Sequence, residues 1–336
     1  MKKIFLSAAF LLFAASEIFC DDVPFFVKEK TDAPKELPVC EFVLLAKDGD
    51  TFRIGEGNQN FTSRRQVQPF RINRYETTYK HWYLIRLWAE SNGYFFQNPG
   101  QQGSSGSRGK APTHVDAWEP VTNISWYDAV VWCNAYSEFS KKTPCYYFKD
   151  EDGSKKILRD SSDTVSCDLC ICDFNADGFR LPTETEWEYA ARKTKSGFQG
   201  GNLASGQIDS NGKDSESVKL NDVAWSFQNA RGTHRVGTAG TPFDPSAPPL
   251  PGSGRANGAS IFDMSGNVLE WCWDWLADYS DEEGRAAGPE FGSERVMRGG
   301  SWNKYTLFLG AGDRYSFDPN EYFNYFGFRI ATSSLR

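Results

Sequence analysis

The sequence predicts one α+β domain in which two short helices and small sheets are joined by many irregular loops. Two capping motifs each precede a short helical run of apolar residues, and residues 41–57 alternate enough for two strands. Gly, Asn and Pro interrupt most of the remainder, including the long stretch 237–260. This combination is typical of the α+β class.

The first 20 residues predict an export signal. A basic start at residues 2–3 precedes an apolar run over residues 4–15, which is too short to span a membrane. Cleavage could follow the small residues 14–16 or fall next to Cys20, which would then carry a lipid. The bulky Phe19 favours plain secretion over that lipid anchor.

Residues 21–40 are charged and contain Pro, so we interpret them as a tether before a domain at 41–336. The predicted location is the cell surface or the periplasm. Because no later segment reaches ~18 apolar residues, membrane contact is expected only through an N-terminal lipid. The net charge of −7 argues against a nucleic-acid partner, which would need a basic field.

The local patterns place the elements in order. The two strands within 41–57 flank a turn at Asp48-Gly49-Asp50, and a helical stripe then ends near Asn92-Gly93. That stripe consists of Trp82, Ile85, Trp88 and Ala89. The loop at 98–112 contains "GK", but it lacks the spacing of a phosphate-binding loop.

Two capping boxes predict where the short helices begin. Ser125 is followed by Asp128, and Thr183 is followed by Glu186. In each pair the hydroxyl caps the first free amides while the acidic side chain reaches back to the cap.

Two motifs resemble metal sites without meeting their requirements. The cluster Cys167, Cys170 and Cys172 has no His nearby, so a disulfide or a set of loop thiols is favoured over zinc. The run 173–178, "DFNADG", matches half of a calcium loop, but Glu184 begins the next capped helix. An Asn/Asp/Gly turn is therefore the favoured interpretation.

Five ordered phrases carry a resemblance to a known family. They are "PVTNISWYDAVVWCNAYSE", "GFRLPTETEWEYAAR", "IFDMSGNVLEWCWDW", "RVMRGGSWN" and "FGFRIA". Together they resemble the formylglycine-generating-enzyme, or sulfatase-modifying-factor, family over residues 41–331. The resemblance implies a loop-rich C-type-lectin-like fold in which the N- and C-terminal strands meet.

The chemistry of that family is tested on these residues. Its oxidase members use a cysteine pair just after "GGS" to bind copper, because thiolates are good ligands of copper(I). Here no Cys, His or Met follows Ser301, and the last cysteine, Cys272, is expected to be a buried thiol. A second branch holds iron on an added domain, but only His81, His114 and His234 exist here. We therefore predict no catalysis and no required cofactor.

The C-terminal end also resembles the variable proteins of diversity-generating retroelements, most closely the spirochaete type. In these proteins a reverse transcriptase rewrites adenine-containing codons inside a constant frame. The frame here is Arg298–Trp302 and Gly327–Arg329, within a segment at about 298–329. The resemblance implies an exported ligand-binding protein whose target is a protein or glycan on another cell or a host surface.

The residue types of the segment lead to the same interpretation. Aromatic rings give contact area at low entropic cost, and short polar groups give adaptable hydrogen bonds. Phe326 and Phe328 are expected in the core and Trp302 as half-buried scaffold, whereas we expect exposure for Tyr305, Phe308, Tyr315, Phe317, Tyr322, Phe323 and Tyr325. The predicted ligand-binding residues are Lys304, Tyr305, Leu307, Phe308, Asp313, Tyr315, Ser316, Phe317, Asp318, Asn320, Tyr322, Phe323, Asn324 and Tyr325.

The phrase "FDMSGNVLEW" leaves two interpretations open. The resemblance implies a structural calcium ion, held by carboxylates of Asp263 and Glu270 and by carbonyls near Gly266 and Val268. The alternative is a turn in which Asn267 bonds its own backbone. Charged residues within the family phrases are expected to form a salt-bridged scaffold: Arg180, Glu186, Glu188, Arg298 and Arg329.

Two other classes of function stay open at this point. One is an oxidase relative with altered chemistry, and the other is a structural protein of the cell envelope.

Overall fold

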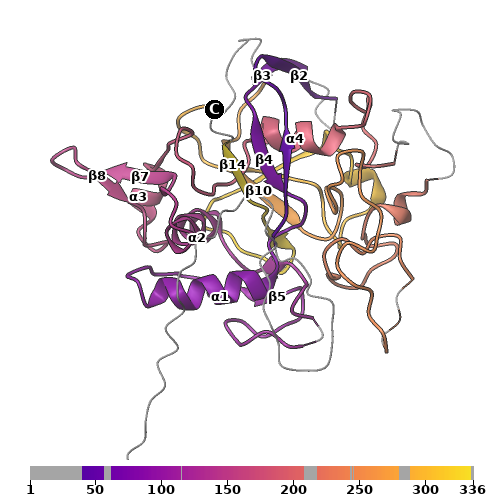
Figure 1. Cartoon of the computed structure of the whole chain (residues 1–336), viewed down its shortest axis with the longest axis horizontal. Helices are drawn as coiled ribbons and strands as arrows, with labels where there is room; N and C mark the ends of the chain where they lie inside the picture. The colour runs from indigo at the N-terminus through magenta and orange to yellow at the C-terminus, as the bar shows by residue number, and fades with distance from the viewer. Residues whose placement is uncertain are drawn as a thin grey trace, which may run out of the picture.

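The computed structural model describes residues 40–56, 62–114, 116–207, 218–242, 244, 246–279 and 288–333. The predicted export signal and, apart from Cys40, the predicted tether lie outside these ranges. Figure 1 shows small sheets, short helices and long connecting loops, which is the α+β class that the sequence predicts. Within the described ranges, no helix has the length and apolar character needed to cross a bilayer.

The N- and C-terminal strands meet in one three-stranded sheet. Strand β4 (Phe70–Asn73) lies between β1 (Phe42–Leu45) and β14 (Ala331–Ser333), and both pairings are antiparallel. Both strands predicted within 41–57 exist, but they do not pair with each other. After the turn at Asp48-Gly49, β2 (Asp50–Gly55) pairs instead with β3 (Thr62–Val67).

A four-stranded sheet forms the centre of the C-terminal half. Its order is β12-β11-β10-β13, with β10 (Leu269–Trp275), β11 (Arg295–Arg298) and β12 (Arg314–Phe317) antiparallel. The short β13 (Phe326–Gly327) runs parallel to β10. Strand β12 lies at the edge of this sheet. The remaining short strands are β5 (Gln101–Gln102), β6 (Val121–Thr122), β7 (Tyr146–Lys149), β8 (Lys155–Ile157) and β9 (Ile171–Cys172).

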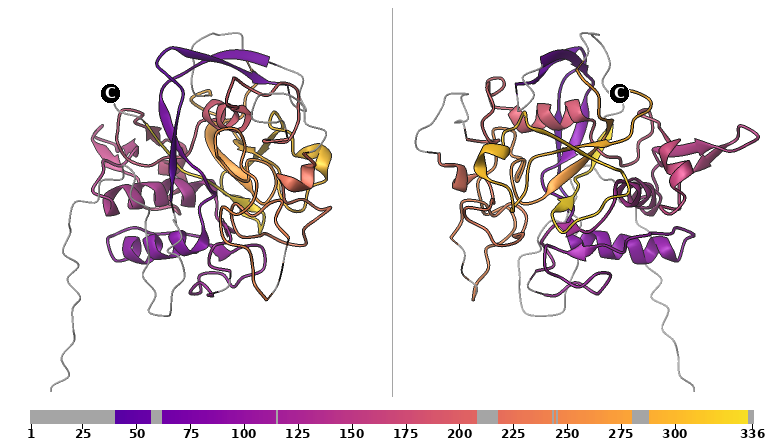
Figure 2. Two further views of the ribbon diagram at one scale, coloured as in Figure 1. Left: turned by 45° about the vertical axis from the view of Figure 1, so that its right-hand side comes forward. Right: turned by 180° about the vertical axis from the view of Figure 1, so that it is seen from behind.

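The described ranges hold four α-helices, which are the helical stripe and the two capped helices of the sequence analysis together with the short α3. They are α1 (Tyr79–Glu90), α2 (Trp126–Phe139), α3 (Thr164–Asp168) and α4 (Glu184–Arg192), with 3-10 turns η1 (Leu220–Asp222) and η2 (Thr306–Phe308). Helices α1 and α2 lie side by side, and α4 lies beside the β2–β3 hairpin (Figures 1 and 2).

Both predicted capping boxes are confirmed. The Ser125 hydroxyl accepts from the Asp128 amide at 3.2 Å, and Asp128 accepts from the Ser125 amide at 2.9 Å. The equivalent Thr183 and Glu186 bonds are 3.1 and 2.9 Å. These bonds satisfy free amides at the starts of α2 and α4.

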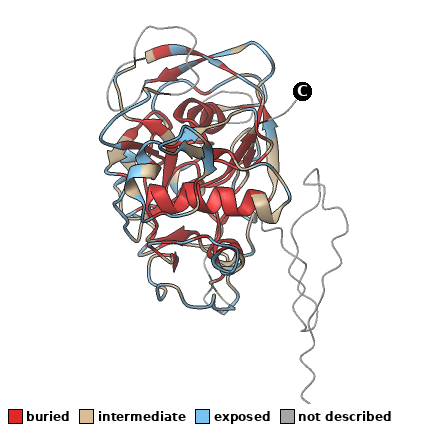
Figure 3. Cartoon of the chain, turned by 90° about the vertical axis from the view of Figure 1, so that its left-hand side faces the viewer, coloured by how far each residue is buried: buried red, intermediate tan, exposed pale blue. Residues whose placement is uncertain are grey.

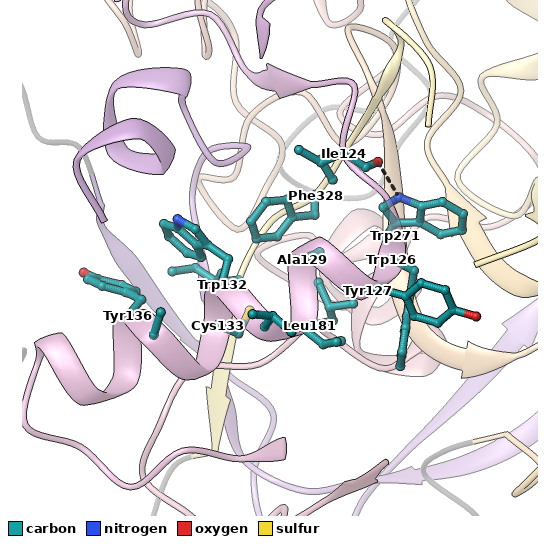
Figure 4. Packing of buried hydrophobic residues seen from close by; sticks show 14 of the residues in the cluster. Ile124, Trp126, Tyr127, Ala129, Trp132, Cys133, Tyr136, Leu181, Trp271 and Phe328 are labelled. Atoms are coloured by element: carbon teal, nitrogen blue, oxygen red, sulfur yellow. Dashed lines mark hydrogen bonds between the residues drawn. The ribbon is translucent and has the colours of Figure 1, made fainter. Parts of the chain in front are cut away.

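Helix α2 lies at the centre of the main hydrophobic core. Figure 3 shows it almost wholly buried, which explains why its apolar residues follow no single stripe. Its Trp132 packs 5.5 Å from Phe328 between ring centroids, and Trp271 donates to the Ile124 carbonyl oxygen at 3.4 Å (Figure 4). Phe326 and Phe328 are fully buried, as predicted. The core therefore fixes the chain on the C-terminal side of the aromatic segment.

Candidate binding face

Buried ion pairs hold the strands on which the aromatic segment begins. Arg298 at the end of β11 bonds Glu188 of α4, which also accepts from Arg192 at 2.7 Å. Arg314 at the start of β12 contacts Glu184 through two bonds of 2.6 and 2.8 Å. Such charges must be paired when they are buried, so the pairs fix β11 and β12 against α4.

The other family-phrase charges are paired as expected. Arg180 bonds Glu186 at 2.6 Å, and Arg329 bonds Glu270 at 2.6 Å. Burial alone would lower the pKa of Arg329, but Glu270 beside it more than offsets this and raises the pKa. The prediction of a salt-bridged scaffold is therefore confirmed.

A glycine pair turns the chain out of β11 and into the segment. Gly299 and Gly300 have φ values of 96° and 71°. A Cβ on Gly300 would lie 2.3 Å from Leu309 Cδ2 and 2.7 Å from the Phe308 carbonyl oxygen. Two residues later lies Trp302, whose side chain is half-buried and whose backbone N–H donates to the Asn267 carbonyl oxygen at 2.9 Å. The turn thus folds residues 304–309 back over the frame.

Four of the seven rings expected in solvent are exposed. Tyr305, Phe308, Tyr322 and Phe323 expose 56, 38, 39 and 38% of their surface. Leu307 is 70% exposed, which leaves a large apolar side chain in water. Isolated apolar side chains on a surface are common, but five on one segment are typical of an interaction site.

The other three rings correct the prediction of exposure. Tyr315, Phe317 and Tyr325 are half-buried and pack against the main core. Phe317 lies 4.6 Å from Phe326 between centroids, and the Tyr315 hydroxyl donates to the Phe308 carbonyl oxygen at 2.6 Å. One face of β12 lies over the core, so these rings support the rim of the surface rather than stand free.

The polar positions of the segment also divide into two kinds. Asp313 is buried and accepts from the Asn202 amide group at 2.7 Å, so it ties down a loop, contrary to the expectation of a ligand contact. Ser316 and Asn324 are half-buried and bond Glu294 and the Ser104 carbonyl oxygen at 2.6 and 3.0 Å. Asp318 and Asn320 are exposed.

The half-buried Lys304 lies between two rings of the segment. Its ammonium group is 5.8 Å from the Tyr315 ring centroid and 5.9 Å from that of Tyr325. A cation at this distance is attracted to the face of a ring.

Sequence reasoning missed side chains from distant loops that border the segment. Phe227 is 45% exposed, and its ring centroid lies 5.0 Å from that of Tyr305. The Arg108 guanidinium lies 4.8 Å from the Tyr322 ring centroid. No local pattern connects these positions with the segment, but the Gly-rich run 98–112 is the kind of loop that often carries function.

The residues predicted to hold calcium do not fit that ion. Both Glu270 oxygens accept from Arg329, at 2.6 and 2.7 Å, and one also accepts from Trp187 at 2.7 Å. Asp263 accepts from the Gly237 amide. Throughout the described part of the chain, no group of three or more His, Cys, Asp or Glu side chains is arranged to hold a metal ion.

The backbone amides of this phrase are hydrogen-bonded to other parts of the chain. The Gly266 amide donates to the Gly299 carbonyl oxygen at 2.8 Å, and the Val268 amide donates to Glu76 at 3.1 Å. Asn267 donates to Glu76 at 2.6 Å and accepts from the His234 amide at 2.9 Å, so it does not bond its own backbone either. The phrase therefore joins distant segments through hydrogen bonds within the chain.

The thiols and the acidic turn have structural surroundings. Six cysteines of the described ranges are free thiols, and Cys272 among them is fully buried; the six are Cys133, Cys145, Cys167, Cys170, Cys172 and Cys272. Burial raises the pKa of Cys170 to about 12, which keeps this thiol protonated and unreactive. Residues 173–178 form turns, and the carboxylate of Glu184 faces Arg314 and Tyr279 rather than that loop.

Comparison with known proteins gives three further findings. The family model described as "Sulfatase-modifying factor enzyme 1-like domain" matches residues 29–334. "Chaperone protein LppX" of Paenibacillus barcinonensis is 29% identical over 263 residues, which cover 77% of this chain and 78% of that protein. The formylglycine-generating enzyme of Thermomonospora curvata is 26% identical over 283 residues, covering 77% and 82%.

Among solved structures, "Treponema denticola variable protein 1" superposes with a TM-score of 0.65. It is 26% identical, and the superposition covers 88% of this chain and 95% of that one. The C-type-lectin-like fold expected from the sequence phrases is thereby confirmed.

Proposed function

The chain belongs to the sulfatase-modifying factor enzyme 1-like domain family. Within this family, we propose that it is an exported binding protein that performs no catalysis. Its binding face consists of the exposed side chains of residues 304–325. The observation that carries this proposal is the contrast within the segment. Its ends are fixed by buried ion pairs and core rings, while Tyr305, Leu307 and Tyr322 stay in solvent.

The energetics favour a binding role for these side chains. Leaving large apolar groups in water gives the fold nothing, whereas a ring at the centre of an interface can contribute ~2 kcal/mol or more. Because the scaffold already holds the segment in place, little ordering entropy would be lost on binding. The relative named as a chaperone supports a protein as the partner.

The chemistry of the segment supports a role without catalysis. The sequence from Trp302 to Arg336 contains no Cys, so the thiolate pair that the oxidase members use has no counterpart there. His81 and His234 are held neutral, since burial lowers their pKa values to about 3 and about 4. They lie on separate elements, against Trp132 and Trp225 respectively.

Likeness to a variable protein supports the proposal that the segment is diversified by a retroelement. The proposal predicts a near-copy of the codons for residues 298–330 beside a reverse-transcriptase gene, with adenines at the positions that differ. Export is proposed on the N-terminal signal, with lipid on Cys20 as the alternative to free secretion, and mass spectrometry of the mature N-terminus distinguishes the two.

The binding face is tested with the combined variant Tyr305→Ala, Leu307→Ala and Tyr322→Ala. Arrays of peptides and glycans are probed with this variant and the wild-type protein, and we expect the variant to lose the wild-type signals with little change in melting temperature. The matched control is Val165→Ala on α3 with Leu169→Ala at the C-cap of that helix, where both side chains are also exposed. Equal signals from the wild type and the segment variant would refute the proposed face.

A further inference from the structure

Two loops outside the segment share an unusual charge composition. Residues 99–114 and 223–235 contain no Asp or Glu, although the whole chain contains 44. They carry four basic residues, which are Arg108, Lys110, Arg231 and Arg235. In a chain with a net charge of −7, these loops form local basic stretches.

Both loops contact the aromatic segment and each other. Asn324 donates to the Ser104 carbonyl oxygen at 3.0 Å, and the Phe227 amide donates to the Lys304 carbonyl oxygen at 3.0 Å. Ser104 and Thr233 exchange two hydrogen bonds of 2.7 and 3.0 Å, which connect the loops directly. The two loops and the segment therefore form one continuous surface.

Two arginines on these loops are placed beside aromatic rings of that surface. Arg108 lies over Tyr322, and Arg231 is 5.7 Å from the Phe227 ring centroid. Both are exposed. Their hydrogen-bond acceptors are neutral: Asn98 for Arg108 at 2.8 Å, and the carbonyl oxygens of Phe227 and Ala230 for Arg231.

Ring contact orients a guanidinium without neutralising it. Neither Arg108 nor Arg231 forms an ion pair with a carboxylate of the described residues. The planar N–H groups that these hydrogen bonds leave over match the geometry of a carboxylate. Lys304 adds a third positive charge on the segment itself, beside the Tyr315 and Tyr325 rings.

We propose that Arg108 and Arg231 form a constant cationic border of the binding face, and that this border selects protein partners that dock through an acidic segment. The inference rests on the proposed function, because it names the partner class of the same face. Arg108, Phe227 and Arg231 lie outside residues 298–329, so they persist while the segment changes. The border sets the class of partner, and the segment selects within it.

A protein fits this surface better than an anionic glycan. Sugar rings stack well on Tyr and Phe, but Leu307, at 70% exposure, offers only aliphatic surface. Aliphatic surface is removed from water by apolar side chains of a protein partner. The partner segment would therefore combine carboxylates for the border with apolar side chains for the centre.

The test uses the full chain and three defined polymers in a surface-binding assay. The probe is a random copolymer of Glu and Tyr, with a copolymer of Lys and Tyr as its charge-reversed counterpart and heparin as an anionic glycan. We expect the wild type to bind the Glu–Tyr copolymer more tightly than the other two, and less tightly as salt is raised. The variant Arg108→Gln with Arg231→Gln should weaken this binding about tenfold.

A matched variant controls for net charge. Arg53→Gln with Arg64→Gln also removes two positive charges, but from exposed cross-strand positions on β2 and β3. It should change the affinity by less than about twofold. If both arginine variants bound the Glu–Tyr copolymer equally weakly, the effect would be one of net charge alone, and the proposal of a cationic border would be refuted.

The other outcomes are equally informative. Preferential binding of heparin would show that the two arginines recognise an anionic glycan, and it would refute the proposal of a protein partner. If neither anionic polymer bound, the proposal of a cationic border would itself be refuted. The variant Tyr305→Ala, Leu307→Ala and Tyr322→Ala separates the two proposals. If it binds the Glu–Tyr copolymer like the wild type while the Arg108 and Arg231 variant does not, the border stands and the proposed aromatic face fails.

Discussion

Replacing Arg329 by Met removes the cation around which three buried carboxylates are gathered. Arg329 and Glu270 are fully buried, and two hydrogen bonds of 2.6 and 2.7 Å join them. The guanidinium also donates to three backbone carbonyl oxygens, those of Asn73, Arg74 and Phe262, at 3.0–3.2 Å. The arginine therefore connects β4 and the phrase before β10 to the C-terminal end.

The expected loss follows from what the variant leaves behind. Removing one partner of a buried ion pair typically destabilises a protein by about 3–5 kcal/mol, because the other charge stays buried without compensation. Domains are stable by about 5–15 kcal/mol, so Arg329→Met should remove a large share of the free energy of unfolding. The three carbonyl oxygens each lose one donor, although that of Arg74 still accepts from the Phe262 amide, which places the estimate toward the upper end.

The loss should depend on pH. Burial, followed by neighbouring carboxylates, raises the pKa of Glu76, and burial raises that of Asp263 from 3.8 to about 6. A carboxyl with a raised pKa stabilises the fold below its ordinary pKa and loses that contribution as pH rises through the raised value. Without Arg329 both pKa values rise further, so the variant should lose more stability than the wild type between pH 5 and 7.

Urea unfolding followed by tryptophan fluorescence measures both effects at pH 5 and pH 7. The control is Arg74→Met, which removes an arginine of a half-exposed ion pair with Glu41 and should cost less than about 1 kcal/mol. A loss below about 1 kcal/mol in Arg329→Met, or a loss of equal size at the two pH values, would refute the reasoning.

Three further predictions concern the scaffold around the segment. Gly300→Ala should destabilise by about 1–3 kcal/mol, because it forces an unfavourable φ and a contact with Leu309; an unchanged melting temperature would contradict this. Burial raises the pKa of Glu119 from 4.5 to about 8. The protonated carboxyl therefore stabilises the fold below pH 4.5, and this contribution to the free energy of unfolding is lost as pH rises through 8. Glu119→Gln, which keeps the acceptor for Thr233, should flatten the melting temperature between pH 5 and 9, and an unaltered slope would count against the assignment. Melting should not respond to EDTA, whereas a fall of several degrees would reinstate calcium at Glu270.

Local patterns predicted local structure well. The capping boxes at Ser125 and Thr183 were recognisable because each consists of side chains three residues apart, and the structure has both. The strand pairings were not available from local pattern, since β1 pairs with β4 across the β2–β3 hairpin. Alternation identifies a strand but not its neighbour.

The proposed binding face shows the same limit of sequence reasoning. Residue types predicted that the segment carries an exposed aromatic surface, and Tyr305 and Tyr322 are exposed. They could not predict that Tyr315 and Phe317 are half-buried, because that depends on which face of β12 lies over the core. Arg108 could not be assigned to the face at all, since its ring partner, Tyr322, lies more than 200 residues along the chain.

The position of β14 makes closure of the N-terminal sheet depend on the reading frame of the aromatic segment. This strand follows the aromatic segment and pairs directly with β4, with Ala331 opposite Ile72 and Thr332 opposite Arg71. A frameshift or premature stop introduced between residues 304 and 325 would delete the strand and leave one side of β4 without its partner. Only a segment that keeps the reading frame can therefore close this sheet.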